Sequence, residues 1–100
     1  MLDYLKEYNI SVKTIKDIKD KYYEELIDTL DNNEYEVRKI LDYFKSIGIK
    51  DFNGLLSENL PIFLSEYNYI YNTFNKIPNL KNTVKKINED YMYINEVIDY

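Results

Sequence analysis

Four carboxylates gather in one short stretch of the chain, and paired carboxylates serve acid–base hydrolysis and the binding of hard cations. They are Glu24, Glu25, Asp28 and Asp31. Glu24 and Asp28 stand four residues apart, which makes them neighbours on a helix. Acid–base catalysis needs one carboxyl whose pKa is raised by burial, and nothing apolar closes over this acidic face. The stretch therefore predicts solvated helix surface.

A second set of oxygen ligands alternates along the chain as the first ligands of a calcium-binding loop do. These residues are Asp31, Asn33 and Tyr35. A calcium loop of that type needs glycine at its sixth position and glutamate at its twelfth. This chain has Glu36 and Asp42 there. We expect no metal site and no cofactor.

Nucleophilic catalysis lacks its usual base because the chain contains no histidine, and with no cysteine it also lacks a thiol nucleophile. The serines are expected at helix ends, as capping or turn residues: Ser11, Ser46, Ser57 and Ser65. With two glycines in the whole chain there is no glycine-rich phosphate loop. We therefore predict that the protein is not an enzyme.

The stretch from residue 35 to 64 organises the rest of the chain. Its apolar residues recur at helical spacing and form one stripe: Val37, Ile40, Leu41, Phe44 and Ile47. Gly48 is expected to end this helix. Asn33 is expected to cap its start, with Glu36 reaching back as in a capping box. Asp51 then caps a short helix, and Pro61 suits the first turn of another.

Helices are also predicted on both sides of this stretch. Leu2, Leu5 and Tyr8 mark a short N-terminal helix that Asn9 ends and that covers the open end of the array. Ser11 is expected to cap the next helix, which either runs unbroken to Leu30 or bends near Tyr22, and the repeat favours the bend. Further along, Ser65 caps a helix that Pro78 stops, Leu80 starts another, and a final segment covers residues 91–98. No strand is predicted.

Part of the central pattern recurs thirty residues later. Tyr67, Ile70, Phe74, Ile77 and Pro78 follow the spacing of Val37, Ile40, Phe44, Ile47 and Gly48. A period of that size indicates stacked helical units. We predict a single all-α domain over residues 1–100, a small right-handed array or bundle of about six to seven short helices built from degenerate repeats of about 30 residues.

The phrase V-x-x-I-L-x-Y-F-K-S-I-G-I-x-D-F-x-x-L-L-x-x-x-P-x-F-L, within residues 35–64, resembles the repeat of the mitochondrial transcription termination factor family. The resemblance implies units of a long helix, a second helix and a short 3₁₀ turn near a proline. It also implies nucleic-acid binding by a basic concave surface. The neighbouring units hold Glu24 and Tyr91 where the central unit has its proline.

Tyrosines supply a candidate protein-binding patch, because tyrosine brings a large contact area with a polar tip. Tyr22 and Tyr67 lie on apolar stripes and are expected in the core. Five others have a polar-facing position and are expected to form an exposed patch: Tyr35, Tyr43, Tyr69, Tyr71 and Tyr93. A protein partner is therefore our first functional hypothesis.

Lysines supply the candidate nucleic-acid contacts of the second hypothesis: Lys13, Lys16, Lys81, Lys85 and Lys86. The net charge of −5 and the sequence pI near 4.7 oppose this role, because the chain as a whole repels a polyanion. The third hypothesis is an acidic inhibitor whose carboxylates mimic phosphates. It requires the acids to line one face.

The chain has no run of about eighteen apolar residues, the length that a membrane-spanning helix needs. Its first residues, MLDYLKEY, carry an acid where a secretory signal would be basic. We therefore expect a cytoplasmic protein with no membrane partner. The identity of the partner and the oligomeric state stay open.

Overall fold

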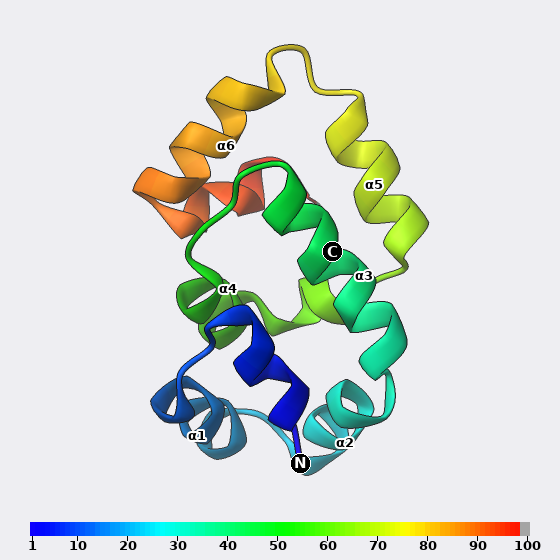
Figure 1. Cartoon of the computed structure of the whole chain (residues 1–100), viewed down its shortest axis with the longest axis vertical. Coiled ribbons are helices and arrows are strands. Elements are labelled where there is room, and N and C mark those ends of the chain that lie inside the picture. Colours follow the sequence, from blue (N-terminus) through cyan, green and yellow to red (C-terminus); the bar gives the residue numbers. More distant parts are fainter. Residues whose placement is uncertain (99–100) are drawn as a thin grey trace.

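The computed structural model describes residues 1–98, and these fold into six α-helices and three 3₁₀ helices with no strand (Figure 1). This confirms the all-α prediction. In chain order the elements are η1 (Asp3–Tyr8), α1 (Val12–Lys21), α2 (Glu24–Asn32), α3 (Glu34–Ser46), α4 (Phe52–Asn59), η2 (Leu60–Leu64), α5 (Tyr67–Asn75), α6 (Leu80–Glu89) and η3 (Tyr91–Glu96).

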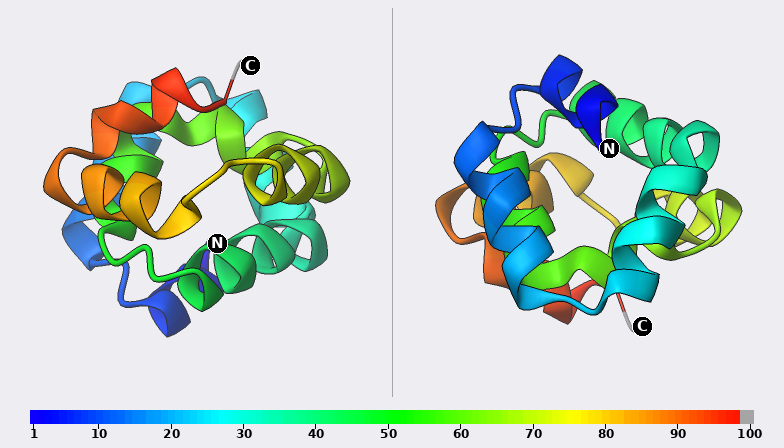
Figure 2. Two further views of the ribbon diagram at one scale, coloured as in Figure 1. Left: turned by 90° about the horizontal axis from the view of Figure 1, so that it is seen from above. Right: turned by 90° about the horizontal axis from the view of Figure 1, so that it is seen from below.

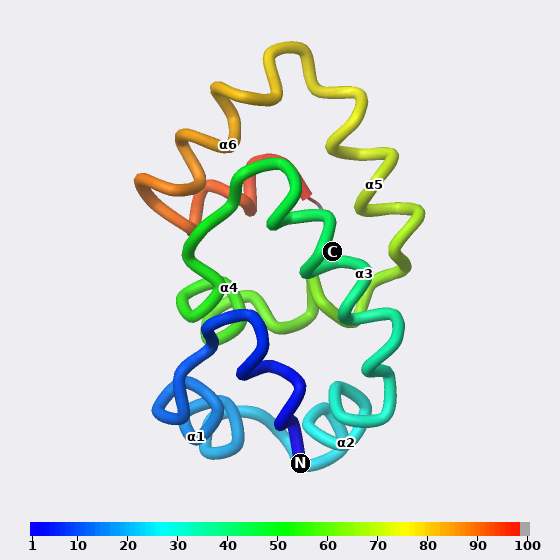
Figure 3. Tube along the Cα trace, viewed as in Figure 1, coloured from blue at the N-terminus to red at the C-terminus, as the bar shows by residue number. Residues whose placement is uncertain are grey.

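The helices form two walls, with α1, α4 and α6 on one side and α2, α3 and α5 on the other (Figures 1 and 2). From α3 onward the chain crosses from one wall to the other with each helix (Figure 3). Within the walls α3 packs on α5 and α1 on α4, while η2 contacts α2, α3 and α4. Two α-helices and a 3₁₀ helix thus follow one another twice, as α3–α4–η2 and α5–α6–η3, but only the first set begins with its longer helix: α3 has 13 residues and α4 has 8, whereas α5 has 9 and α6 has 10.

The apolar stripes meet between the walls in one core. Phe44, Phe63 and Phe74 are its largest side chains with almost no exposed surface. The Phe44 ring lies 5.8 Å from the Phe63 ring and 5.4 Å from the Phe74 ring, centroid to centroid. Aromatic pairs at this distance add to the free energy gained by burial. The predicted apolar stripe of the central helix, with Phe44 in it, thus faces the core, and Phe63 is buried beside it.

The N-terminal segment covers one end of the core, as the sequence predicted. Leu2, just before η1, and Leu5, within it, are fully buried. The Tyr4 hydroxyl donates to the Leu30 carbonyl at 2.7 Å, and the Tyr8 hydroxyl donates to Asp42 Oδ1 at 2.9 Å. These bonds attach η1 to α2 and α3.

Arg38, the sole arginine of the sequence, fastens η1 to α3 from outside. Its guanidinium donates to both carboxylate oxygens of Glu7 and, at 2.8 Å, to Glu34. The same group lies 5.4 Å from the centre of the Tyr4 ring. A planar fork of donors suits such a bidentate contact, which a lysine would not reproduce.

Most predicted helix ends are confirmed. Asn9 and Gly48 have φ of 61° and 101°, in the left-handed region where asparagine and glycine are tolerated. Ser11 Oγ accepts from the Thr14 amide, and Asp51 Oδ1 accepts from the Gly54 amide at 3.0 Å. The bend near Tyr22 is also present, because α1 ends at Lys21 and α2 begins at Glu24.

Two predicted caps are wrong. The Asn33 side chain makes no cap bond, because this residue is the single-residue junction of α2 and α3 and works through its backbone. Its amide donates to the Thr29 carbonyl and its carbonyl accepts from the Val37 amide, each at 3.0 Å. Ser65 does not cap α5 either; its hydroxyl donates to the Pro61 carbonyl at 3.2 Å, and Glu66 precedes the helix.

Helix α4 lies against two other parts of the chain. Asn53 Oδ1 accepts from the Ser11 amide at 2.9 Å, and its Nδ2 donates to the Asn9 carbonyl at 3.4 Å. On the next residue, a methyl group added to Gly54 would stand 2.6 Å from the Tyr91 ring. Glycine at this position therefore permits the close approach of η3 to α4.

Candidate functional site

The structure separates the five tyrosines predicted to form a patch. Tyr35 has 71% of its surface exposed, and Tyr69 and Tyr71 have about 40%. Tyr93 is partly buried on η3. Tyr43 is 9% exposed, so its assignment to an exposed patch is wrong. Tyr43 is covered by α5. The Tyr71 ring lies 5.2 Å from the Tyr43 ring between centroids, and Asn75 Oδ1 accepts a hydrogen bond from the Tyr43 hydroxyl at 3.0 Å.

Tyr67, which the sequence assigned to the core, is partly exposed and joins two of these tyrosines on one surface. Its ring lies 5.8 Å from the Tyr71 ring. On its other side, the Lys39 ammonium lies 5.6 Å from the Tyr67 ring and 4.7 Å from the Tyr35 ring. Tyr35, Lys39, Tyr67 and Tyr71 thus form a continuous row across α3 and α5.

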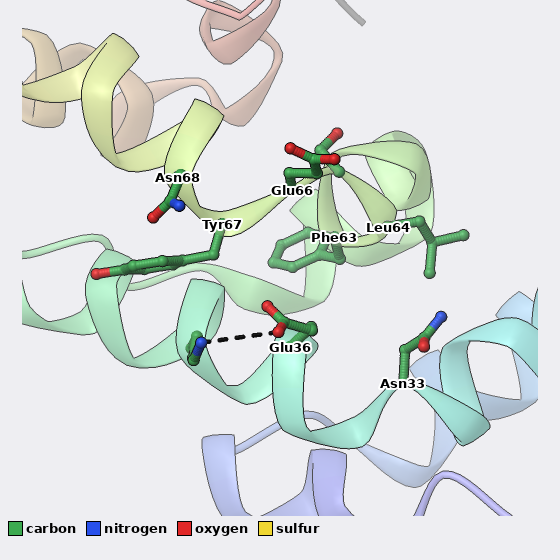
Figure 4. Close-up of a pocket in the computed structure, with 9 residues that line it drawn as sticks. Asn33, Glu36, Phe63, Leu64, Glu66, Tyr67 and Asn68 are labelled. Carbon is green, nitrogen blue, oxygen red and sulfur yellow. Dashed lines mark ion pairs between the residues drawn. The ribbon is translucent and has the colours of Figure 1, made fainter.

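Beside this row lies an open groove of about 420 Å³, which we call the α3–α5 groove. It is bounded by the start of α3, by η2 and by the start of α5 (Figure 4). Its lining residues are Asn33, Glu36, Lys39, Phe63, Leu64, Ser65, Glu66, Tyr67 and Asn68. The groove combines aromatic and apolar surface with carboxylates, amides and a hydroxyl.

The electrostatics of the groove depend on Glu36, Lys39 and Glu66. Lys39 Nζ lies 3.7 Å from Glu36 Oε1, the ion pair drawn in Figure 4. Glu66 forms no ion pair with any residue between 1 and 98. The lining therefore carries two carboxylates against one ammonium and is acidic overall.

The predicted nucleic-acid contacts fall into two groups that the fold keeps apart. Lys13 and Lys16 lie on α1, whereas Lys81, Lys85 and Lys86 lie on α6. Figure 1 shows α1 near one end of the long axis and α6 toward the other. Lys13 is paired with Asp17 at 3.2 Å, and Lys86 lies 5.3 Å from the Tyr93 ring.

The four clustered carboxylates lie on α2, as predicted, and Glu24 and Glu25 are exposed. Asp31 is occupied structurally, because its Oδ1 accepts from the Leu2 amide at 2.7 Å. Glu24 and Asp28 border a second open hollow of about 370 Å³ with Met1, Lys19 and Ile27. Within residues 1–98, acidic side chains form no group of three that is arranged to hold a metal ion.

Sequence reasoning missed the α3–α5 groove. Its walls come from two separate segments of the chain, residues 33–39 and 63–68, and most of their side chains look like ordinary polar helix surface. One local signal was present, because Tyr35, Glu36 and Lys39 stand at the three- and four-residue spacings that make helix neighbours.

In the part of the chain that is described, no helix has the length and apolar character to cross a bilayer. No protein-family model, curated protein or solved structure matches this sequence and fold.

Proposed function

We propose that this chain is a non-enzymatic module that binds a protein partner through the α3–α5 groove and the exposed Tyr35 beside it. The observation that carries the proposal is the row of Tyr35, Lys39 and Tyr67 along a preformed groove. Aromatic residues next to a concave surface are typical of the anchor points of protein interfaces. The cytoplasmic location stays a prediction from the sequence, which a fluorescent fusion would test.

The test places a photo-crosslinking benzoylphenylalanine at Tyr35 in cells that express the native protein. Because this side chain is 71% exposed, the fold tolerates the larger ring. The matched control carries the same group at Tyr23, which is 79% exposed and lies between α1 and α2, away from the groove. We expect a discrete protein adduct from position 35 and none of that mass from position 23. Identical adduct patterns, or none at position 35, would contradict the proposal.

Nucleic-acid binding by a repeat similar to the termination-factor family is the second candidate. The order of two α-helices and a 3₁₀ helix, in α3–α4–η2 and again in α5–α6–η3, favours it, although only the first set begins with a long helix. The separation of the lysines on α1 and α6 and the net charge of −5 weigh against it. It predicts that Lys85→Glu with Lys86→Glu abolishes a salt-dependent gel shift, and absence of any shift at low salt would exclude it.

The acidic-mimic hypothesis receives less support. Several carboxylates are engaged by cations of the chain itself, as Glu7 and Glu34 are by Arg38 and Glu58 is by Lys21. A phosphate mimic would present its charges to the target enzyme instead. Failure of the protein to inhibit nucleic-acid enzymes would remove this alternative.

A further inference from the structure

The geometry points to a basic partner segment as the occupant of the α3–α5 groove, with one arginine or lysine side chain lying against Tyr67 between the carboxylates of Glu36 and Glu66. This inference rests on the proposed protein-binding function and specifies the chemistry of the partner.

The strongest argument is that a cation already occupies part of the site. The ammonium of Lys39 lies within 6 Å of two tyrosine ring centres and within ion-pair distance of Glu36. Ring faces and a carboxylate together stabilise a cation at such a position. Because the Lys39 side chain is 39% exposed, an incoming cation can reach the same rings from solvent.

The remaining lining residues fit the rest of a basic side chain. Leu64, which is partly exposed, offers apolar surface to the aliphatic stem of a lysine or arginine, and the buried Phe63 lies beneath the groove. The side-chain oxygens of Asn33, Ser65 and Asn68 are acceptors for its N–H groups. Figure 4 shows Glu36 and Glu66 on facing sides of the groove with Phe63 between them.

The charge of the groove disfavours an acidic partner segment. An acidic segment would approach two carboxylates, Glu36 and Glu66, on a chain with a net charge of −5. The single ammonium of the lining is already paired. A basic segment gains from both the local and the overall charge.

The probes for the test are two blocked octapeptides, one alternating arginine with leucine and one alternating glutamate with leucine. Each is titrated to millimolar concentration into the ¹⁵N- and ¹³C-labelled full chain, and chemical shifts are followed by NMR. We expect the arginine peptide to shift the signals of Leu64, Glu66 and Tyr67, and the glutamate peptide to leave them in place. Absence of groove shifts with the arginine peptide would overturn the inference.

Two charge-matched pairs of variants separate the groove from the overall charge. Glu66→Gln and Glu89→Gln remove the same charge, but Glu89 is exposed on α6. We expect at least a threefold loss of affinity for the arginine peptide in the first and no such loss in the second. Lys39→Gln removes the internal cation and is expected to increase affinity threefold or more, whereas Lys45→Gln, on the exposed last turn of α3, is not.

Equal effects within either pair would show that only net charge matters and would overturn the inference. The two proposals fail in different ways. A specific adduct at position 35 without groove binding of the arginine peptide leaves protein binding standing and removes the basic segment. Groove binding of the peptide without any adduct at position 35 supports the chemistry of the groove but contradicts a resident protein partner.

Discussion

Phe44 of α3 and Phe74 of α5 contact each other at 5.4 Å between ring centres, and they stand thirty residues apart in the chain. Both side chains are fully buried. At this pair, two corresponding positions of the recurring sequence pattern pack directly against each other in α3 and α5. The same packing sets the distance between the two helices that border the α3–α5 groove.

We predict that Phe44→Ala destabilises the protein by about 3–5 kcal/mol, because it removes a buried ring and leaves a cavity. For a small domain this is a large part of the total stability. Urea denaturation followed by circular dichroism measures the effect. Val12→Ala is the control, since Val12 is 69% exposed, and it should change stability little. A loss below about 1 kcal/mol for Phe44→Ala would contradict the described core.

Gly54→Ala should destabilise the protein although alanine is the better helix former by about 1 kcal/mol. The added methyl group would stand 2.6 Å from the Tyr91 ring, so η3 must move away from α4. In a Tyr91→Ala background the ring is absent and the closest remaining atom is Asp51 Oδ2 at 3.0 Å, so the same substitution should lose its destabilising effect and stabilise the chain by at most about 1 kcal/mol. A double-mutant cycle measures this reversal of sign. A stabilising Gly54→Ala in the native background would show that Tyr91 does not lie there.

The ion pair between Glu7 and Arg38 should make stability depend on pH in the acid range. The hydrogen bonds from Arg38 lower the pKa of the Glu7 carboxyl. Its contribution is therefore present above the unfolded pKa of about 4.3 and is lost as pH falls through the lower folded pKa. Glu7→Gln should destabilise at pH 7 and match the native protein near pH 2. Glu89 forms no ion pair with any of the residues that the structure describes, so Glu89→Gln should show no such dependence.

Tyr4 should make folding stability fall as pH rises in the alkaline range. Burial, and next the nearby Asp31, raise the pKa of its hydroxyl in the folded chain. The folded state thus keeps a proton that the unfolded chain loses above about pH 10, so stability falls as pH rises beyond that value. Denaturation between pH 9 and 11 should show a shallower fall for Tyr4→Phe than for the native protein. Tyr23→Phe, at an exposed position, should follow the native curve.

Local signals predicted the fold well because they act over a few residues. Asn9, Ser11, Gly48 and Asp51 each end or start a helix through a preference of their own backbone or side chain. The apolar spacing of α3 likewise predicted that Phe44 is buried. Asn33 failed because the end of α2 meets the start of α3 there, which leaves no free turn for its side chain to cap.

The burial of Tyr43 and the α3–α5 groove depend on contacts between segments that are distant in the chain, so local sequence patterns did not predict them. Tyr43 lies beside the apolar stripe of α3, and only the path of α5 determines that it is covered. The groove has the same origin, since Glu36 and Glu66 become neighbours only when η2 brings α5 back to the start of α3. The candidate site was therefore beyond local reasoning, although its Tyr35–Lys39 contact was within reach of it.

Asn53 and Gly54 form the dipeptide at which asparagine deamidates most readily in an extended chain, because the glycine amide can attack the neighbouring side-chain carbonyl. Here the helix holds that amide in a bond to Asp51 Oδ1, and the Asn53 side chain is engaged with the backbone of Asn9 and Ser11. The folded protein should thus resist this chemical ageing at Asn53. The rate at which aspartate accumulates at position 53 during storage would therefore report the frequency of local unfolding of α4.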